Sequence, residues 1–570
     1  MRSIPHKLRT RPAKVDRVNK PPALELHFTF TIMSSIVNTL GLRSVPGVPT
    51  PNHAATLLLV NWFFAYGVMS TRVTKTRLRI DNNVAPREDL ATLGEAAVKS
   101  GKIDRKALNK LKRQEAAHAN AVEGYSFFVA AILTALFAGV PNETINTIGV
   151  CALPSHIIPG AQIIPANDKS ALKNVGAHHQ IYPDRRTVTI RASKNEEDDI
   201  SSDFLWAIHQ ANHGGRLLLE KGKTYMIGTK LDLTFLDDIE VQLEGQLKFT
   251  NNITYWQANN FYYSFQKSIT FWRWGGQDIK IFGKGTLDGN GQKWYDEFSG
   301  SQILDPDNTF YRPILFLTEN ATRVSVEGIT QLNSPCWTNF FVRTNDVSFD
   351  DVFIHAYSTN ASVDAANTDG FDTLNVDGLR VTNTRVDNGD DCFSPKSNTS
   401  HIFVQNLWCN NSHGVSMGSI GQYSGVMDFI ENAYMENVTL LNGQNGARLK
   451  AWAGEDVGYG RITNVTYRNV QIQNTDNPIV LDQCYFDINS TECAKYPSQV
   501  NVTNIVFDNI WGTSSGKEGK VIADLTCSPN AVCSNISLSR INVTSPAGSP
   551  PEIICDGIQG SIGVNCTSST

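Results

Sequence analysis

Three short polar motifs in the second half of the chain carry side chains that could do acid–base chemistry. Asn367 and Asp369 lie in the first motif, Asp390 and Asp391 in the second, and His413 in the third. Hydrolysis of a glycosidic bond needs a carboxylic acid that protonates the leaving oxygen and a carboxylate that activates water. Crowded aspartates can supply both forms, because like-charge repulsion raises at least one pKa and keeps a proton available.

A fourth motif adds positive charge. Arg448 and Lys450 are two residues apart, so on a strand their side chains point to the same side. Arginine binds a carboxylate through two parallel hydrogen bonds, so this pair could hold a uronic acid. His413 could orient or tune an acid. Alone, an Asp-Asp pair is usually a turn or a calcium ligand, and R-x-K is usually a solvated strand face; only their coincidence on one face favours catalysis.

The elements that must position these motifs are short strands in a repeat. From Phe249 onward, runs that alternate apolar and polar residues break at Asn, Gly, Asp or Ser, and seven of them start 23, 32, 23, 31, 29 and 38 residues apart. The alternation is that of strands, and repeats of this length with variable inserts indicate a solenoid. A coil of this length stacks the motifs on one face, because Asp390 follows Asp369 by 21 residues and His413 follows Asp391 by 22.

Asparagine recurs inside these runs, at Asn406, Asn437, Asn469 and Asn509. It is unfavourable in an ordinary sheet, but stacked coils can satisfy it with ladders of side-chain amides. We therefore expect an all-β, right-handed parallel β-helix. The alternative is a β-sandwich, which has turn signals about every 8–12 residues. The segment Ser202–Leu218 has apolar residues at helical spacing, with Gly214-Gly215 as a stop, and predicts a helix that caps the first coil.

The motifs N-T-D, D-D, H-G and R-x-K, in this order, resemble the polygalacturonase family of pectin hydrolases, glycoside hydrolase family 28, over roughly residues 157–570. The resemblance implies that Asp390 is the general acid. It implies that Asp369 and Asp391 activate water, with inversion at the anomeric carbon, and that His413 assists. It further implies no metal and no other cofactor, and substrate contacts from Asn367, Arg448, Lys450 and Tyr485.

Some segments narrow the resemblance to exo-acting fungal members, which release galacturonic acid from the non-reducing end of polygalacturonate (pectin). They are Gly389 before the aspartate pair, Cys409–Tyr423, Gly446–Gly454 and Cys527–Asn535. Long inserts near residues 255–274 and 305–313 could close the cleft beyond the terminal sugar. Two alternatives remain: a related rhamnogalacturonan or xylogalacturonan hydrolase, and a carbohydrate-binding β-helix protein, which would have no use for three clustered carboxylates.

Composition indicates an exported protein. The net charge of −5 provides no basic field for a nucleic acid. All ten cysteines lie from Cys151 onward; 484/493, 527/533 and 555/566 are close pairs typical of local disulfides, and no CxxC pair suggests zinc. The eight disulfide candidates are Cys392, Cys409, Cys484, Cys493, Cys527, Cys533, Cys555 and Cys566. Glycosylation sequons point the same way, at Asn252, Asn320, Asn360, Asn398, Asn410, Asn437, Asn464, Asn489, Asn501, Asn535 and Asn542. We expect a secreted monomer.

The first quarter of the chain has a different character. A basic tail precedes two apolar runs, Ala55–Met69 and Tyr125–Val140, each slightly shorter than the roughly 18–20 residues of a membrane-spanning helix. Extension back to Ala121 makes the second long enough, and buried helices of a soluble domain are the alternative.

Between these runs, Arg113, His118, Asn120 and Glu123 resemble the MAPEG family, membrane proteins of glutathione and eicosanoid metabolism, although the resemblance stops near Val140. The expected plan is a basic tail (1–20), a MAPEG-like helical segment that could associate with a membrane (21–140), a linker (141–158) and the β-helix (159–570). The abrupt change would follow from a gene model that joins two neighbouring reading frames.

Overall fold

The structure, a computed structural model, describes residues 181–567 apart from 183, 300, 302, 306 and 487, together with Leu172 and parts of 50–146. The chain divides into two compact units, residues 1–162 and 163–570. The second unit carries every acid–base motif of the sequence, so it is described first.

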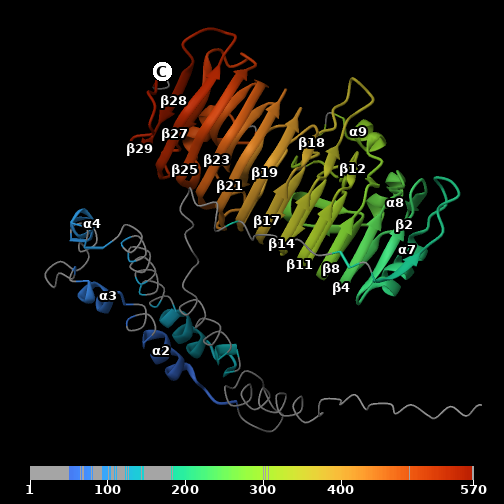
Figure 1. Cartoon of the computed structure of the whole chain (residues 1–570), viewed down its shortest axis with the longest axis horizontal. Helices are drawn as coiled ribbons and strands as arrows, with labels where there is room; N and C mark the ends of the chain where they lie inside the picture. Colours follow the sequence, from blue (N-terminus) through green and yellow to red (C-terminus); the bar gives the residue numbers. More distant parts are fainter. Residues whose placement is uncertain are drawn as a thin grey trace, which may run out of the picture. The chain divides into compact units, whose positions relative to one another are not determined.

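The second unit is a right-handed parallel β-helix, as the sequence predicts (Figure 1). Each coil contributes one strand to a long parallel ladder, so that Ile402 pairs with Leu379 on one side and Ala433 on the other. The strands of this ladder are β1 (Arg186–Thr189), β2 (Gly215–Leu219), β4 (Leu231–Leu243), β8 (Trp272–Phe282), β11 (Phe316–Glu327), β14 (Asn345–Asp350), β17 (Val376–Thr382), β19 (Thr399–Asn410), β21 (Met427–Leu441), β23 (Tyr459–Thr475), β25 (Gln499–Ser514), β27 (Cys533–Thr544) and β29 (Ile558–Gln559).

Two further faces complete the coils. One comprises β3 (Thr224–Ile227), β5 (Gln246–Phe249), β9 (Thr286–Asp288), β12 (Thr330–Leu332), β15 (Phe353–His355) and β18 (Arg385–Asp387). The other comprises β13 (Asn339–Val342), β16 (Phe371–Leu374), β20 (Val415–Ile420), β22 (Asn445–Trp452), β24 (Asn477–Tyr485), β26 (Val521–Thr526) and β28 (Glu552–Asp556). Single parallel bridges through Phe393 and Ser394 join β16 to β20, so this face is continuous across the acid–base motifs.

The core lies inside the coils, where alternate strand residues point inward. Val347, Leu379, Ile402, Ala433 and Val465 stack in register and are all buried. Burial of one apolar side chain per strand position contributes about 1.5–3 kcal/mol each. This repeated stack is what makes the faces of successive coils stay aligned.

Asparagine ladders form at the bends, as the sequence predicts. Asn406, Asn437, Asn469 and Asn509 have φ between 55° and 58°, the left-handed region that asparagine tolerates. Their amides bond from coil to coil at 2.8–3.2 Å across 31, 32 and 40 residues. The coils therefore vary in length through loops outside the ladder, while the bend itself is preserved.

The predicted capping helix is present and ends before the expected stop at Gly214 and Gly215. Helix α7 spans Ser201–Ala211 and buries Phe204 and Ile208 over the first coil. The chain then turns at Gly214 (φ 88°), where the sequence places the stop of the helix, and continues as β2. Leu217 faces the core from a strand, a position that helical periodicity alone could not distinguish.

Other short elements decorate the coils. An outlying sheet consists of β6 (Phe261–Tyr263), β7 (Ser268–Thr270) and β10 (Pro313–Ile314), with the single-turn helix η4 (Phe265–Lys267). The remaining helices of this unit are α8 (Ile253–Ala258), α9 (Gln292–Phe298) and α10 (Ser490–Lys495). The two inserts that the sequence singled out thus build one small sheet.

Four disulfides are present in the described part of the β-helix. They join Cys392 to Cys409, Cys484 to Cys493, Cys527 to Cys533 and Cys555 to Cys566, which confirms the three close pairs and the two remaining candidates. Cys336 is a buried free thiol.

The first unit contains α2 (Ala54–Trp62), α3 (Arg72–Arg77), α4 (Glu95–Lys99) and a helical stretch at 128–137. Ala54 of α2 packs with Ile132 and Ile145 in a small apolar cluster. Among the described residues, no helix has both the length and the apolar character to cross a membrane. His118 is helical, whereas Arg113, Asn120, Glu123, the basic tail and most of the linker lie outside the described residues.

Candidate active site

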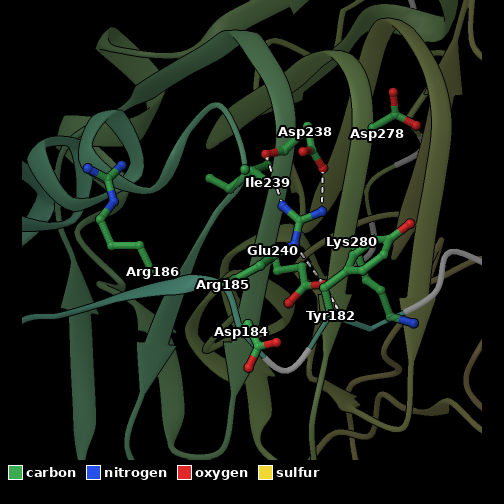
Figure 2. Close-up of a pocket in the computed structure, with 10 residues that line it drawn as sticks. Tyr182, Asp184, Arg185, Arg186, Asp238, Ile239, Glu240, Asp278 and Lys280 are labelled. Atoms are coloured by element: carbon green, nitrogen blue, oxygen red, sulfur yellow. Dashed lines mark hydrogen bonds and ion pairs between the residues drawn. The ribbon is translucent and has the colours of Figure 1, made fainter. Parts of the chain in front are cut away.

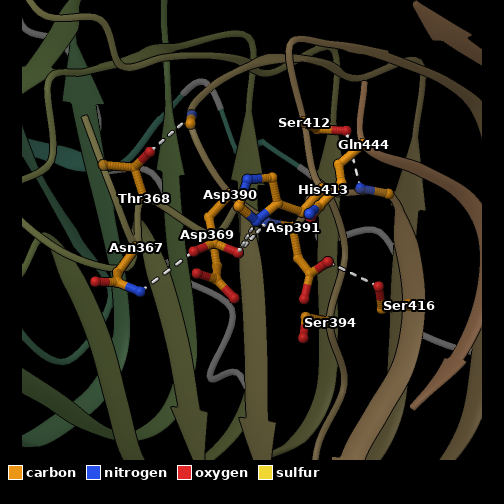
Figure 3. Close-up of polar contacts among 12 residues, drawn as sticks. Asn367, Thr368, Asp369, Asp390, Asp391, Ser394, Ser412, His413, Ser416 and Gln444 are labelled. Carbon is orange, nitrogen blue, oxygen red and sulfur yellow. Dashed lines mark hydrogen bonds and ion pairs between the residues drawn. The ribbon is translucent and has the colours of Figure 1, made fainter. Parts of the chain in front are cut away.

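The stacked coils bring the acid–base motifs together on one face. The backbone N–H of Gly370 donates to the backbone carbonyl of Asp391, and the backbone N–H of His413 donates to the backbone carbonyl of Asp390. These bonds hold three successive coils in register at the site. The carboxylates of Asp369, Asp390 and Asp391 all have oxygens within 4.8 Å of one another (Figure 3). The predicted convergence of the three aspartates is therefore present.

Asp390 is the most exposed of the three carboxylates, with 16% of its side chain accessible. Its Oδ1 lies 3.2 Å from His413 Nδ1 and accepts the backbone N–H of Asp391 at 2.7 Å, while Asn367 Nδ2 donates to Oδ2 at 3.2 Å. Burial opposes ionisation here, but the neighbouring His413 outweighs it and holds the pKa of Asp390 below its usual range. In return, Asp390 overcomes the burial of His413 and raises the pKa of that imidazole.

Asp391 has no accessible side-chain surface. Its Oδ2 forms a short ion pair with Lys450, and its Oδ1 accepts the Ser416 hydroxyl at 2.7 Å. Burial disfavours the charged form, but Lys450 more than offsets that effect and lowers the pKa of Asp391. This carboxylate is therefore held ionised.

Asp369 is the third member and is held in the opposite state. It is 4% exposed, and burial together with the charges of Asp372 and Asp390 raises its pKa well above the usual range, against the opposing effect of Lys396. The three carboxylates thus differ in ionisation because their partners differ. The cluster therefore holds one carboxyl group that keeps a proton and two that are ionised, and hydrolysis requires both forms.

Arg448 and Lys450 project from one strand toward one ring, as their spacing predicts. The Arg448 guanidinium and the Lys450 ammonium lie 5.3 Å and 4.7 Å from the ring centre of Tyr485. Each cation is already paired, however: Lys450 with Asp391, and Arg448 with Asp482. Their contact with a uronate carboxylate stays a prediction, and Arg448, at 11% exposure, is the more accessible of the two.

Sequence reasoning missed three charged residues at the site. Lys396 lies between Asp369 and Asp372, and Arg312 donates to Asn367 Oδ1 at 2.6 Å, beneath the amide that contacts Asp390. Asp372 lies within the first motif, yet neither it nor Lys396 received a role. Arg312 lies in an insert, where nothing in the sequence indicates which coil it would reach.

The donor set favours acid–base chemistry over metal binding. Two of the three carboxylates face buried ammonium groups, Asp369 that of Lys396 and Asp391 that of Lys450. A divalent cation would be placed against two fixed positive charges, an arrangement that metal sites avoid. That the reaction requires no metal stays a prediction.

A separate hollow of about 570 Å³ lies on the first coils, among Tyr182, Asp184, Arg185, Asp238 and Glu240 (Figure 2). Its charges are paired with one another: Arg185 contacts both Asp238 and Glu240. None of the acid–base motifs lines it, so its ion pairs are read as part of the packing of the first coils.

The fold and the cluster of carboxylates indicate a class of enzyme, the β-helical glycoside hydrolases. Comparison with known proteins agrees. Residues 216–567 match the model of the glycosyl hydrolases family 28, and the chain belongs to this family. Residues 53–154 match the MAPEG family model, which extends somewhat beyond the predicted limit near Val140.

Curated relatives match most of the second unit. Exopolygalacturonase B of Aspergillus niger is 76% identical over 420 residues, which are 74% of this chain and 95% of that protein. A probable exopolygalacturonase B of Aspergillus oryzae is also 76% identical, over 414 residues and 95% of its length.

Among solved structures, the endo-xylogalacturonan hydrolase of Aspergillus tubingensis matches with a TM-score of 0.61 and 28% identity, covering 67% of this chain and 99% of that one. A hyperthermoactive exopolygalacturonase of Thermotoga maritima matches with a TM-score of 0.50 and 19% identity, over 69% of this chain and 92% of that one, and supports the fold alone.

Proposed function

We propose that Asp390 is the general acid, and Asp369 and Asp391 the bases, of the hydrolysis that this enzyme performs. It is an exo-acting hydrolase of α-1,4-linked galacturonic acid, which it releases from the non-reducing end of polygalacturonate. The observation that carries the assignment of roles is the packing of the three carboxylates within 4.8 Å, each with a different set of partners.

The exposures support this division of roles. The glycosidic oxygen enters from the groove and meets Asp390, which is more accessible than the buried Asp369 and Asp391. In the free enzyme the proton resides on Asp369, and it moves to Asp390 across the short gap between the carboxylates when substrate binds. Asp390 then protonates the leaving oxygen as the glycosidic C–O bond breaks. Water forms the new C–O bond and gives one proton to one of the two ionised carboxylates, Asp391 or Asp369.

The occupied carboxylate oxygens favour direct attack by water, and hence inversion. Retention requires a carboxylate that bonds to the anomeric carbon. Asp391 is inaccessible and held by Ser416 and Lys450, and Asp390 has contacts on both oxygens. The three carboxylates are closer together than the separation of about 6.5–9.5 Å common in inverting enzymes, so the water must bind beside the cluster rather than between two of its members. Proton NMR of the first product would show the β-anomer; an initial α-anomer would refute the assignment.

The small sheet of the two inserts supports the closure of one end of the groove. Gln266 donates to Gln422 at 3.0 Å, and its backbone N–H donates to the Tyr423 hydroxyl at 2.9 Å, which ties residues 261–270 to the loop after β20. Beneath this bridge, Phe265 belongs to the same apolar cluster as Trp337, whose ring lies 5.0 Å from the Lys396 ammonium. The bridge therefore borders the carboxylates, where it can stop a polymer after its terminal sugar.

The test is the variant Asp390→Asn in the full chain, assayed on polygalacturonate with chromatography of early products. We expect a loss of kcat of at least about 100-fold, the contribution typical of general acid catalysis, with the fold retained. Asp351→Asn, an exposed carboxylate paired with Lys284, is the matched control and should leave activity unchanged. Wild-type enzyme should give galacturonic acid as the only early product; a ladder of oligomers would contradict exo action. Retained activity in Asp390→Asn would reject its role.

Secretion, a monomeric state and glycosylation are further parts of this proposal. Most candidate sequons are exposed; Asn398 and Asn410 are half-buried, and Asn464 is buried with its amide bonded to Asn432. A shift in mass after deglycosylation, together with a monomeric mass in solution, would support it. Whether residues 1–140 belong to the natural enzyme is tested by sequencing the transcript across residues 140–159: one continuous message would reject the joined reading frames.

A further inference from the structure

Lys396 is a buried cation at the site that the mechanism above does not use. Its side chain is 3% exposed, and its ammonium lies 2.7 Å from Asp372 Oδ1, 2.8 Å from Ser394 Oγ and 3.6 Å from Asp369 Oδ2. Trp337 covers it, with the ring centre 5.0 Å away. Among the described residues, Lys396 is the only cation within 4.0 Å of either Asp369 or Asp372. An ammonium group with three donors is therefore shared between a catalytic carboxylate and a buried one.

Asp372 has no role in the proposed reaction that would explain why a carboxylate is buried at this position. It is inaccessible, lies in β16 and faces Lys396, and its charge is met by no other ion pair of the described chain. A buried charge pair is weak evidence for stability, because desolvation offsets much of the attraction between the two charges. The pair is better explained by its effect on the third carboxylate, Asp369, which lies within reach of both charges.

We propose that Lys396 and Asp372 form a positioning pair that sets the proton affinity of the aspartate cluster, and thereby the pH range in which the enzyme is active. Lys396 stabilises the ionised form of Asp369, and Asp372 limits that effect by holding the ammonium 2.7 Å from itself and 3.6 Å from Asp369. The active state carries one proton on the cluster. A second proton removes the base, and loss of the only proton removes the acid, so both limbs of the pH profile follow this balance.

The other charged groups around the cluster form no ion pair with Asp369 or Asp372 in the described part of the chain. Burial raises the pKa of Asp372 to about 6 although Lys396 opposes the shift, so Asp372 is itself sensitive to the loss of its partner. Lys450 is committed to Asp391 and His413 to Asp390. The remaining titratable or charged groups that face the cluster are Arg312, Cys336, Arg448, Tyr467 and Tyr485, and none of these forms an ion pair with Asp369 or Asp372.

The inference rests on the proposed role of Asp369, and a charge-neutralisation series separates the two. In the full chain, kcat/KM on polygalacturonate is measured across pH for Lys396→Met, Asp372→Asn and the double variant. Loss of an opposite charge at this distance raises a carboxylate pKa by about 1–3 units. Lys396→Met should therefore move both limbs of the profile upward by at least about 1 pH unit, and Asp372→Asn should move them downward. The double variant, which removes one charge of each sign, should return the profile to within about half a unit of wild type.

A purely structural role predicts a different pattern: activity falls in all three variants, most in the double, with the limbs unmoved, and this result would overturn the proposal. Lys396→Arg keeps the charge and should keep the position of the limbs. If Lys396→Met does not accumulate as folded protein, Asp372→Asn decides alone, and an unmoved profile rejects the proposal. An inactive Asp390→Asn with unmoved limbs in the series would refute this inference only, whereas an active Asp390→Asn would refute the proposed roles.

Discussion

The buried pair of Asp391 and Lys450 should contribute to both stability and catalysis. In Lys450→Met, Asp391 loses its one ion pair with a described residue, although its side chain has no accessible surface. Removal of one partner of a buried pair costs about 3–5 kcal/mol, because the other charge is left uncompensated or must take up a proton. Activity should fall with it, since a protonated Asp391 cannot serve as a base. Urea unfolding followed by tryptophan fluorescence measures the first effect, and kcat/KM the second.

The stability loss in Lys450→Met should depend on pH. Lys450 lowers the folded-state pKa of Asp391, so its contribution to stability is present above the unfolded value of about 3.9 and is lost as the pH falls below it. The cost of Lys450→Met should therefore be largest near neutral pH and shrink below about pH 4. The double variant Lys450→Met/Asp391→Asn should recover most of the stability and none of the activity. A stability loss that is the same at pH 3 and pH 7, or a double variant that is no more stable than the single one, would refute this reasoning.

Other predictions concern the bridge between the inserts and the loop after β20, the asparagine ladder and the disulfide that joins Cys392 to Cys409. Gln266→Ala combined with Tyr423→Phe removes the two side-chain groups that bond the inserts to the loop after β20. Early products should then include oligomers. Chromatography that shows unchanged release of monomer would contradict the closure of the site by this bridge. Asn469→Ala should lower the free energy of unfolding by about 2–3 kcal/mol through lost ladder bonds and left-handed strain, and Asn469→Gly by only about 1, as calorimetry would show. Replacing both Cys392 and Cys409 by alanine opens a link across 17 residues and should cost about 3 kcal/mol in denaturant unfolding; equal stability would contradict the chain-entropy estimate.

The β-helix could be predicted because its signals repeat. The starts of the runs differ by 23, 32, 23 and 31 residues before the fifth interval, and the register confirms these intervals by pairing Val324, Val347, Leu379, Ile402 and Ala433 in sequence. Asparagine at each bend gave an independent signal. The end of the capping helix could be predicted only from Gly214 and Gly215, because the apolar spacing continues into β2, where the same residues suit a buried strand. Periodicity cannot separate the two over so few residues.

The site could be located from the sequence, but its charge states could not. Spacing alone places three aspartates on adjacent coils, because a fixed coil length converts sequence distance into position. Which cation meets which carboxylate depends on distances of less than about 4 Å, at which the Coulomb energy changes steeply. Lys450 lies 59 residues from Asp391, and Lys396 lies 27 from Asp369, so neither pairing follows from the motif in which the aspartate stands.

These ion pairs change the interpretation of an R-x-K motif beside an acidic cluster. If both cations were free, the groove would attract a uronate by charge, and binding would weaken steeply with salt. Lys450 and Arg448 each neutralise an aspartate, so the predicted contact of a uronate with Arg448, the more exposed of the two cations, would require competition with Asp482. Substrate affinity should then depend on shape and hydrogen bonds more than on net charge, which is consistent with a chain whose overall charge is −5 acting on an acidic polymer. A KM that rises only modestly between low and physiological salt would follow from this arrangement, and a steep rise would show that free cations dominate binding.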